Sequence, residues 1–319
     1  MQVLSEKDYN LFEQLISLDQ QSMHKIMSRY LKSKYENIII TSEYIVAIGD
    51  IPIALVAHMD TVFKTPVSNL YYDQRKNVMW SSEGLGADDR AGIFAIIKIL
   101  QAGFKPSIIL TTDEEKGGIG ALILGQQPCP ISNLKYMIEL DRRGANDCVF
   151  YDCYCPSFVD YVESFGFSIQ AGSFSDISFL MSPWHICGVN LSVGYENEHS
   201  MCEILNIDFL FETIEKVKTM LSQIEIPDFT YSTLIHNDKV IFGQHCSCCK
   251  KLFSEYNLIP VKGKDGKPKF YCIDCINNNV NWCDYCGEAY ESETTAQINM
   301  CKNCAEELCT KTLKNNSAE

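Results

Sequence analysis

The sequence predicts an α/β protein, with a mixed, mostly parallel sheet flanked by helices and a small cysteine-rich domain at the C-terminal end. Three observations lead to this prediction. Apolar, β-branched runs alternate with amphipathic segments over residues 1–230, which is typical of a sheet covered on both faces. Potential metal ligands follow several of these runs. Paired cysteines dominate residues 231–319.

The hydrophobic pattern predicts the main elements of the first domain, residues 1–230. Apolar residues at helical spacing predict helices over residues 5–35 (one long helix, or a broken one), 90–103, 117–125 and 206–223. Apolar runs rich in Val and Ile predict strands over residues 38–41, 44–49, 51–58, 107–112, 134–140 and 187–194. The alternation of the two kinds of segment favours a mostly parallel sheet.

Charge and composition exclude several classes of protein. The 319-residue chain carries a formal net charge of −14, which opposes nucleic acid as a partner. It contains no apolar run long enough to span a membrane and no secretion signal, so we expect a cytoplasmic protein without a membrane partner. Sixteen cysteines in such a chain indicate metal binding rather than disulfides.

Metal-ligating side chains stand where the predicted strands end or a helix begins. They are His58 and Asp60, Asp88 and Asp89, the adjacent pair Glu114 and Glu115, Asp141, and His199. Functional groups of such sheets gather at the carboxyl ends of the strands, and this set suits two divalent metals. Taken alone, the glutamate pair is more typical of a solvated acidic turn, because adjacent carboxylates repel each other at a strand end. The joint occurrence of these residues, each after an apolar run, reverses that interpretation and favours a functional pair.

Five short stretches carry a family resemblance over about residues 35–225. They are "HMD", "GADDRAG", "DEEKGG", "ELDRRG" and "NEHS", in this order. They resemble the motifs of the dinuclear zinc exopeptidases and related amidohydrolases, which include aminopeptidases, carboxypeptidases and N-acyl amino acid deacylases. "GADDRAG" followed by "DEE" is most similar to the cytosolic aminopeptidase branch. The resemblance implies the phosphorylase/hydrolase-like fold of that superfamily.

The resemblance also implies a ligand set for two catalytic zinc ions, which cobalt or manganese can replace. Asp88 would bridge both ions. His58 and Asp141 would complete one site, while Glu115 and His199 would complete the other.

Two further roles follow from the resemblance. Glu114 would be the general base that takes a proton from the attacking water and passes it to the leaving amine. Asp60 would hold the second ring nitrogen of His58 and fix its tautomer. The peptide bond after Asp88 would be cis.

The spacing of the ligands leaves no room for the inserted domain of roughly a hundred residues that many larger family members carry. His58 and Asp88 are 30 positions apart, Asp88 and Glu115 are 27 apart, and Asp141 and His199 are 58 apart. The sequence therefore predicts a minimal catalytic domain. A lid or pairing surface would come from elsewhere, and the C-terminal domain is the candidate.

Other residues near these motifs carry weaker hypotheses. Arg142 and Arg143 are candidates for binding a substrate carboxylate, or else they are surface charges. Asp176, in "GSFSDIS", is similar to a pocket-side Gly-Thr-Asp of relatives and is a candidate substrate contact. We expect His185 to cap a strand. Three cysteines without a partner motif are expected to be ordinary buried thiols: Cys148, Cys153 and Cys155.

The C-terminal domain, residues 231–319, contains four C-x-x-C pairs. The pairs are Cys246/Cys249, Cys272/Cys275, Cys283/Cys286 and Cys301/Cys304. They predict two structural Cys₄ zinc sites. Sequential pairing, giving two zinc ribbons or a LIM-like tandem, is favoured over a cross-braced arrangement, and Cys248 is an alternative to either cysteine of the first pair. The domain has no arginine, which favours protein contact, self-association or a lid over nucleic-acid binding.

The sequence therefore predicts a metal-dependent hydrolase that cleaves a peptide or N-acyl amide bond near a chain end. A small-molecule N-acyl amidase is an alternative. A catalytically idle zinc-binding assembly protein is another, although every expected ligand and the expected base are present.

Overall fold

The computed structural model describes residues 4–233 and seven shorter stretches of the C-terminal region. These stretches are 243–250, 252–254, 258–262, 268–272, 275–276, 280–282 and 289–291, and residues 275–276 are helical. The chain divides into two compact units, Met1–Leu234 and Ile235–Glu319. Among the described residues, no helix has both the length and the apolar character needed to cross a membrane.

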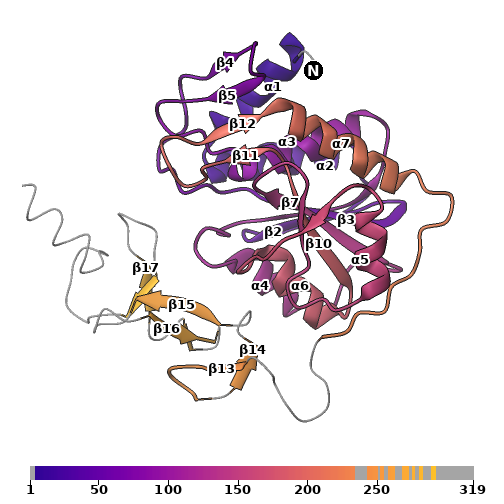
Figure 1. The fold of residues 1–319 in the computed structure, drawn as a ribbon, viewed down its shortest axis with the longest axis vertical. Coiled ribbons are helices and arrows are strands. Elements are labelled where there is room, and N and C mark those ends of the chain that lie inside the picture. The colour runs from indigo at the N-terminus through magenta and orange to yellow at the C-terminus, as the bar shows by residue number, and fades with distance from the viewer. Residues whose placement is uncertain are drawn as a thin grey trace, which may run out of the picture. The chain divides into compact units, whose positions relative to one another are not determined.

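A mixed sheet of eight strands forms the centre of the first unit, in the order β1-β2-β6-β3-β7-β10-β8-β9 (Figure 1). The strands are β1 (Asn37–Ile40), β2 (Tyr44–Ile48), β3 (Ile51–His58), β6 (Pro106–Thr111), β7 (Tyr136–Arg142), β8 (Asp147–Val149), β9 (Ser168–Ile169) and β10 (Cys187–Ser192). The central strands β6, β3, β7 and β10 run parallel, whereas β2 and β8 pair with them antiparallel. The predicted fold class is confirmed.

Helices cover both faces of this sheet (Figure 1). They are α1 (Glu6–Ile16), α2 (Gln20–Lys32), α3 (Ala87–Gln101), α4 (Ile119–Gly125), α5 (Pro156–Glu163), α6 (Asp176–Trp184) and α7 (Ile207–Leu221). α1, α3 and α7 pack together on one face, where the ring of Phe94 lies 5.9 Å from that of Phe12 and 6.0 Å from that of Phe211. α4 and α6 pack on the other face. The central strands are buried for this reason.

The predicted helix over residues 5–35 is two helices. Ser5 begins α1 by accepting a hydrogen bond from the amide of Asp8, and Asp19 begins α2 by accepting one from the amide of Ser22. An N-cap aspartate ends the helical pattern before it, because its backbone is extended. The second helix therefore starts at Gln20 instead of continuing the first.

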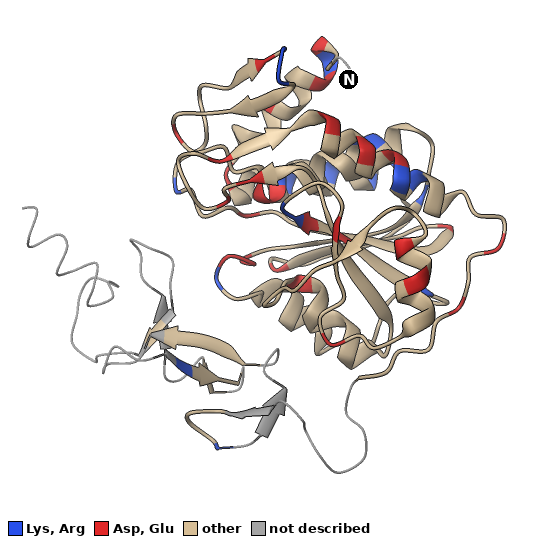
Figure 2. Cartoon of the chain, in the orientation of Figure 1, with Lys and Arg blue, Asp and Glu red and all other residues tan. Residues whose placement is uncertain are grey.

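The exposed side of α7 carries charges of both signs (Figure 2). Lys216 pairs with Glu212 at 2.8 Å, and Lys218 pairs with Glu215 at 2.8 Å. Such pairs contribute only a few tenths of a kcal/mol each, about 0.3–0.5 kcal/mol. They keep this face solvated while Leu210, among other residues, is buried beneath it.

A second, smaller sheet has the order β11-β12-β5-β4. Its strands are β4 (Tyr71–Asp73), β5 (Val78–Trp80), β11 (Tyr195–Glu196) and β12 (Ile204–Asn206). The antiparallel pair β11 and β12 forms a hairpin whose loop contains His199. Strands of two or three residues are too short to show a hydrophobic period, so this sheet was not expected from the sequence.

Two helices and one cap also differ from the sequence-based expectations. α5 and α6 were not predicted; α6 contains Pro183 and polar residues that obscure its period. His185 does not cap a strand. It is the C-cap of α6, with a left-handed backbone (φ 53°), and its amide hydrogen-bonds to the carbonyl of Ser182.

The chain crosses from one side of β3 to the other. After β3 it forms α3 and then β6 on one side of β3; after β6 it forms α4 and then β7 on the other side. α3 and α4 therefore lie on opposite faces of the sheet (Figure 1). In open α/β sheets, ligands bind where the strand order reverses in this way, outside the carboxyl ends of the strands.

The second unit is described only in part. Its strands are β13 (Gly243–His245), β14 (Leu252–Ser254), β15 (Ile259–Lys262), β16 (Pro268–Tyr271), β17 (Val280–Trp282) and β18 (Ala289–Glu291). The last four form a sheet in the order β16-β15-β18-β17. Its described apolar core is small and contains Ile259, Val261, Tyr271 and Ile276. A core of this size usually needs a metal or disulfides for stability.

The segment after α7 packs onto the first unit. The ring of Phe229 lies 5.7 Å from that of Tyr136, 4.8 Å from that of Phe158 and 5.3 Å from that of Tyr161. Farther along, the amide of Tyr154 donates to the carbonyl of Ser232 at 2.7 Å. Residues up to about 233 therefore belong to the packing of the first unit.

We expect a chain that ends at Thr233 to fold, and a chain that ends at Ile226 to be less stable by about 2–3 kcal/mol, because it lacks the half-buried Phe229. Urea unfolding of the two fragments measures the difference. Phe229→Ala in the longer fragment is the matched control and should account for most of it. Equal stabilities would contradict the packing role of Phe229, and an insoluble longer fragment would contradict independent folding.

Candidate functional site

The potential ligands meet at one edge of the main sheet. His58 is the last residue of β3, Glu114 and Glu115 follow the end of β6, and Asp141 lies near the end of β7. Because β6, β3 and β7 are neighbours and run parallel, their carboxyl ends lie side by side. Asp88 reaches the same place from the start of α3.

Two three-residue groups share Asp88. In the first, His58 Nε2 lies 2.9 Å from Asp88 Oδ1 and 3.6 Å from Asp141 Oδ1. In the second, His199 Nε2 lies 3.2 Å from Asp88 Oδ2 and 3.0 Å from Glu115 Oε2. The two oxygens of Asp88 thus face different histidines. Within each group, the candidate ligand atoms all lie within 4.8 Å of one another.

Glu114 lies beside both groups. It is buried, and its carboxylate lies within 4.8 Å of ligand atoms of His58 and Glu115. Burial raises the pKa of Glu114 well above its ordinary value, and the charge of Glu115 raises it further. A carboxylate with a raised pKa is suited to accept a proton near neutral pH.

Asp60 joins the histidine to the glutamate pair. Its Oδ1 lies 3.1 Å from His58 Nδ1 and accepts a hydrogen bond from the amide of Glu114 at 3.0 Å. Its Oδ2 accepts the amide of Glu115 at 3.1 Å. The bond to Nδ1 leaves Nε2 of His58 pointing at Asp88. Asp60 therefore orients residues from two strands at once.

Two further acidic residues support these groups, and of these Glu203 was not anticipated from the sequence. Glu203 is buried and accepts the amides of Gly86 at 2.6 Å and Asp88 at 3.0 Å. Asp89 accepts the amides of His58 at 3.2 Å and Gly92 at 2.7 Å. The Asp88–Asp89 peptide bond is cis, as the resemblance implied.

Asp141 has supports of its own. Ser175 donates to its Oδ2 at 2.9 Å, and Tyr195 donates to its Oδ1 at 3.1 Å. Asn190 accepts the Asp141 amide at 3.0 Å and donates to its carbonyl at 2.8 Å. The only sequence signal for these residues is a polar side chain inside an apolar segment, such as Asn190 within β10.

The pKa values of the site residues are shifted by burial and by the charges of their neighbours. Burial and then the charge of Asp88 raise the pKa of Glu115 to about 7. Burial would also raise the pKa of Asp88, but hydrogen bonds with His199 and His58 bring it below its ordinary value. Hydrogen bonds to Asp88 and Glu115 raise the pKa of His199 to about 11. The buried carboxylates therefore stabilise a positive charge placed among them, as they do for protonated His199.

These residues could hold divalent metal. Histidine nitrogens and carboxylate oxygens are ligands of zinc, and the shared Asp88 offers one oxygen to each group. Glu115 Oε1 is buried and has no hydrogen-bond partner among the described residues. A buried carboxylate oxygen left in this way is costly unless a cation or water meets it. The excess of buried acidic groups favours a cation.

The weaker candidates lie in different surroundings. Arg142 donates to the carbonyl of Ala171 at 3.0 Å, and Arg143 pairs with Glu198 at 2.8 Å on the surface. Asp176 is buried at the start of α6, where it accepts a hydrogen bond from Thr111. Burial raises the pKa of Asp176 to about 7, and its Oδ1 has no partner among the described residues.

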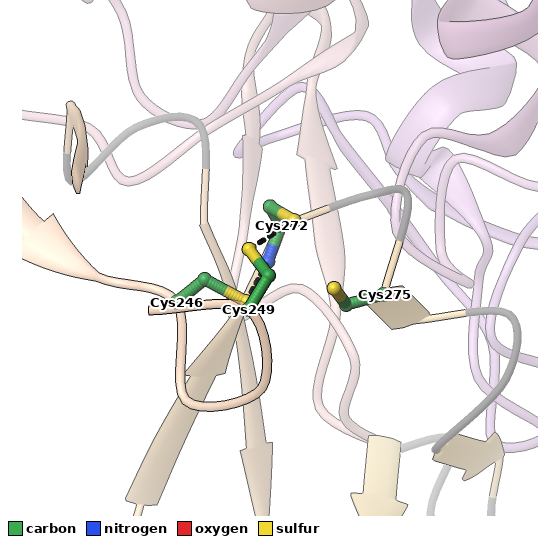
Figure 3. Close-up of side chains that lie close together, drawn as sticks. All are labelled: Cys246, Cys249, Cys272 and Cys275. Atoms are coloured by element: carbon green, nitrogen blue, oxygen red, sulfur yellow. Dashed lines mark hydrogen bonds between the residues drawn. The ribbon is translucent and has the colours of Figure 1, made fainter. Parts of the chain in front are cut away.

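Four cysteines of the second unit lie together (Figure 3). They are Cys246, Cys249, Cys272 and Cys275, whose sulfurs all lie within 4.8 Å of one another. Cys249 Sγ lies 3.7 Å from Cys272 Sγ, and the amide of Cys272 donates to Cys246 Sγ at 3.3 Å. Burial would raise the pKa of Cys246, but amides of the neighbouring cysteines lower it to about 6. A thiolate is the form that binds zinc.

Cys248 lies outside this group of four. The cysteines predicted for a second site lie outside the described residues: Cys283, Cys286, Cys301 and Cys304. In the first unit, Cys148, Cys153 and Cys155 are buried, as expected.

No family model matches the chain, and no curated protein does either. Solved structures do share its fold. A tripeptidase from Staphylococcus aureus is 14% identical with a TM-score of 0.56, over 69% of this chain and 98% of the tripeptidase. A TET aminopeptidase from the marine sediment archaeon Thaumarchaeota archaeon SCGC AB-539-E09 is 12% identical with a TM-score of 0.54, over 70% and 98%. The TET1 peptidase of Pyrococcus horikoshii is 13% identical with a TM-score of 0.50, over 67% and 99%. The first unit therefore has the fold of these peptidase structures.

Proposed function

We propose that the chain is a metal-dependent hydrolase that cleaves peptide or N-acyl amide bonds, as an aminopeptidase-like exopeptidase. One observation carries the proposal: two potential metal-binding groups share Asp88, and the buried carboxylate of Glu114 lies beside them. The first group would use His58 and Asp141, and the second Glu115 and His199. Zinc is the proposed metal, with cobalt or manganese as substitutes.

Two divalent ions held there would lower the pKa of a water molecule and polarise the scissile carbonyl. Glu114 would accept the proton of the attacking water and deliver it to the leaving nitrogen. Asp60 would keep Nδ1 of His58 protonated, so that Nε2 keeps its lone pair for binding. Burial of Glu114 would keep bulk water away from the proton that it carries.

The choice of peptide substrates is supported by the fold shared with the tripeptidase and TET aminopeptidase structures. A small-molecule N-acyl amidase would need the same reacting groups, so hydrolysis assays must separate the two. A catalytically idle assembly protein is less well supported, because Glu114 and both ligand groups lie close enough to act together. Arg142 and Asp176 remain candidate substrate contacts within this proposal.

For the second unit we propose two structural zinc sites. Cys246, Cys249, Cys272 and Cys275 would form the first, in sequential pairing. The second would use the remaining pairs, Cys283/Cys286 and Cys301/Cys304. The unit would serve in self-association or as a lid. The Pyrococcus horikoshii TET1 peptidase can assemble into a tetrahedron or a large octahedral shell, which supports testing the oligomeric state.

A hydrolysis screen tests the function directly. We expect the zinc-loaded chain to cleave aminoacyl amides or short peptides, and a chelator to abolish the activity reversibly. Mass spectrometry of a tripeptide digest shows which terminus is removed. Cleavage of N-acyl amino acids alone would favour the amidase, while inactivity toward all three substrate classes would favour the assembly protein.

Substitution of the adjacent glutamates should separate base from ligand. We expect Glu114→Gln to keep both catalytic metals and to lose about 10²–10⁴-fold in kcat, because an amide cannot accept the proton. We expect Glu115→Gln to lower the metal content of the site from about two ions to about one, because an amide is a poorer zinc ligand. Elemental analysis and steady-state kinetics of both variants measure these effects. Full activity of Glu114→Gln would contradict the assignment of Glu114 as the general base.

Metal content tests the cysteine assignment. We expect the full chain to bind about four zinc ions, and Cys272→Ser to bind about one fewer, because a tetrahedral site loses one of its four ligands. Cys129→Ser, in the first unit, is the control and should leave the content unchanged. A folded second unit that contains no metal in elemental analysis would contradict the assignment.

A further inference from the structure

Gln20 connects the start of α2 to the turn that carries the glutamate pair. Its Nε2 donates to Asp113 Oδ1 at 3.3 Å, and its Oε1 accepts the amide of Asp113 at 3.1 Å. The two residues are 93 positions apart in the sequence. A side-chain amide that both donates to and accepts from one residue fixes that residue in orientation as well as distance.

Asp113 is the residue at which the turn changes direction. Its φ of 56° is left-handed, a conformation that costs a non-glycine residue about 1 kcal/mol or more. Its carbonyl accepts the amides of Lys116 at 3.3 Å and Ile119 at 3.1 Å. Glu114 and Glu115 follow directly, so the orientation of Asp113 sets the direction in which the backbone enters the glutamate pair.

The same junction between α1 and α2 also reaches the end of β3. The buried guanidinium of Arg90 donates to the carbonyl of Leu18 at 2.9 Å and to that of Met59 at 2.7 Å. Leu18 and Gln20 are two residues apart. Residues 18–20 are therefore bonded, directly or through Arg90, to both segments that supply candidate ligands from β3 and β6.

We propose that Gln20 is a positioning residue for the glutamate pair. This inference rests on the proposed function, because it assigns Gln20 a role in aiming Glu114 and Glu115. Asp60 holds the amides of the pair from β3, and Gln20 holds the residue before the pair from α2. Two separate elements thus restrain a turn that must place two like charges next to each other.

A purely structural role for Gln20 predicts different behaviour. Gln20 is half-buried in the first turn of α2, and a lost surface hydrogen bond there would change only stability. Its neighbour Gln21 has the same side chain in the same turn but is exposed. Gln21 is therefore a matched control for helix propensity and for side-chain type.

The test compares Gln20→Met with Gln21→Met in the full chain. Methionine keeps the length and the helix propensity of glutamine but cannot form the two hydrogen bonds. For Gln20→Met we expect kcat to fall about tenfold with KM within about twofold, because a displaced base lowers turnover rather than binding. We expect Gln21→Met to match the wild type within about twofold in both constants.

Two readouts do not depend on activity. In Gln20→Met, hydrogen exchange of the peptide that contains residues 112–118 should be about 3–10-fold faster than in Gln21→Met. Zinc affinity of the weaker catalytic site should fall about 3–10-fold, because partners beyond the ligands tune affinity. The melting temperatures of the two variants should agree within about 3 °C.

The outcomes separate the two proposals. Wild-type exchange and zinc affinity in Gln20→Met would overturn the positioning role, as would an equal loss in Gln21→Met or a loss that only follows a lower melting temperature. If the wild type cleaves no amide substrate when loaded with zinc, the proposed function fails. Exchange and zinc affinity would still decide the role of Gln20 in that case.

Discussion

The candidate site depends on the hydrogen bonds that the carboxylate of Asp60 accepts. This carboxylate is buried and receives three donors: the ring of His58 and the amides of Glu114 and Glu115. Burial would raise the pKa of Asp60, but these donors hold it below its ordinary value. Loss of this one carboxylate would leave three buried donors without their partner, each at a cost of about 1–3 kcal/mol. The carboxylate of Asp60 also explains how the two glutamates can be adjacent. Their consecutive amides bind its two oxygens, while their side chains contact different ligand groups.

The candidate ligands could be predicted from the sequence because each follows or precedes a recognisable element. His58, for example, ends the apolar run that forms β3, and Glu114 lies three residues beyond the run that forms β6. The residues that support them could not be predicted in this way. Glu203 acts through the amides of Gly86 and Asp88, more than 110 positions away, and no local pattern encodes that contact. A buried acid of this kind looks like an ordinary polar residue until the chain is folded.

For the fold, too, some elements could be predicted from the sequence and others could not. The long strands of the main sheet appear in the sequence as runs rich in apolar residues, and the sequence-based boundaries of β3 agree with the structure. Elements that depend on tertiary contacts escaped prediction. α6 contains Pro183, and β11 has only two residues, although it helps to present the loop of His199. The break between α1 and α2 depends on one cap, Asp19, which a hydrophobic pattern does not reveal.

The position of Phe229 has a consequence for attaching labels or tags to the first unit. Phe229 packs against Tyr136, the first residue of β7, whereas Asp141 lies near the other end of that strand. Five steps of about 3.3 Å place the exit of the chain about 17 Å from the ligand edge along the strand. A fluorophore or affinity tag joined after Thr233 would therefore begin at the edge of the sheet remote from His58 and Glu114. Spectroscopic labels at that point would report on the first unit without competing for its metal ligands.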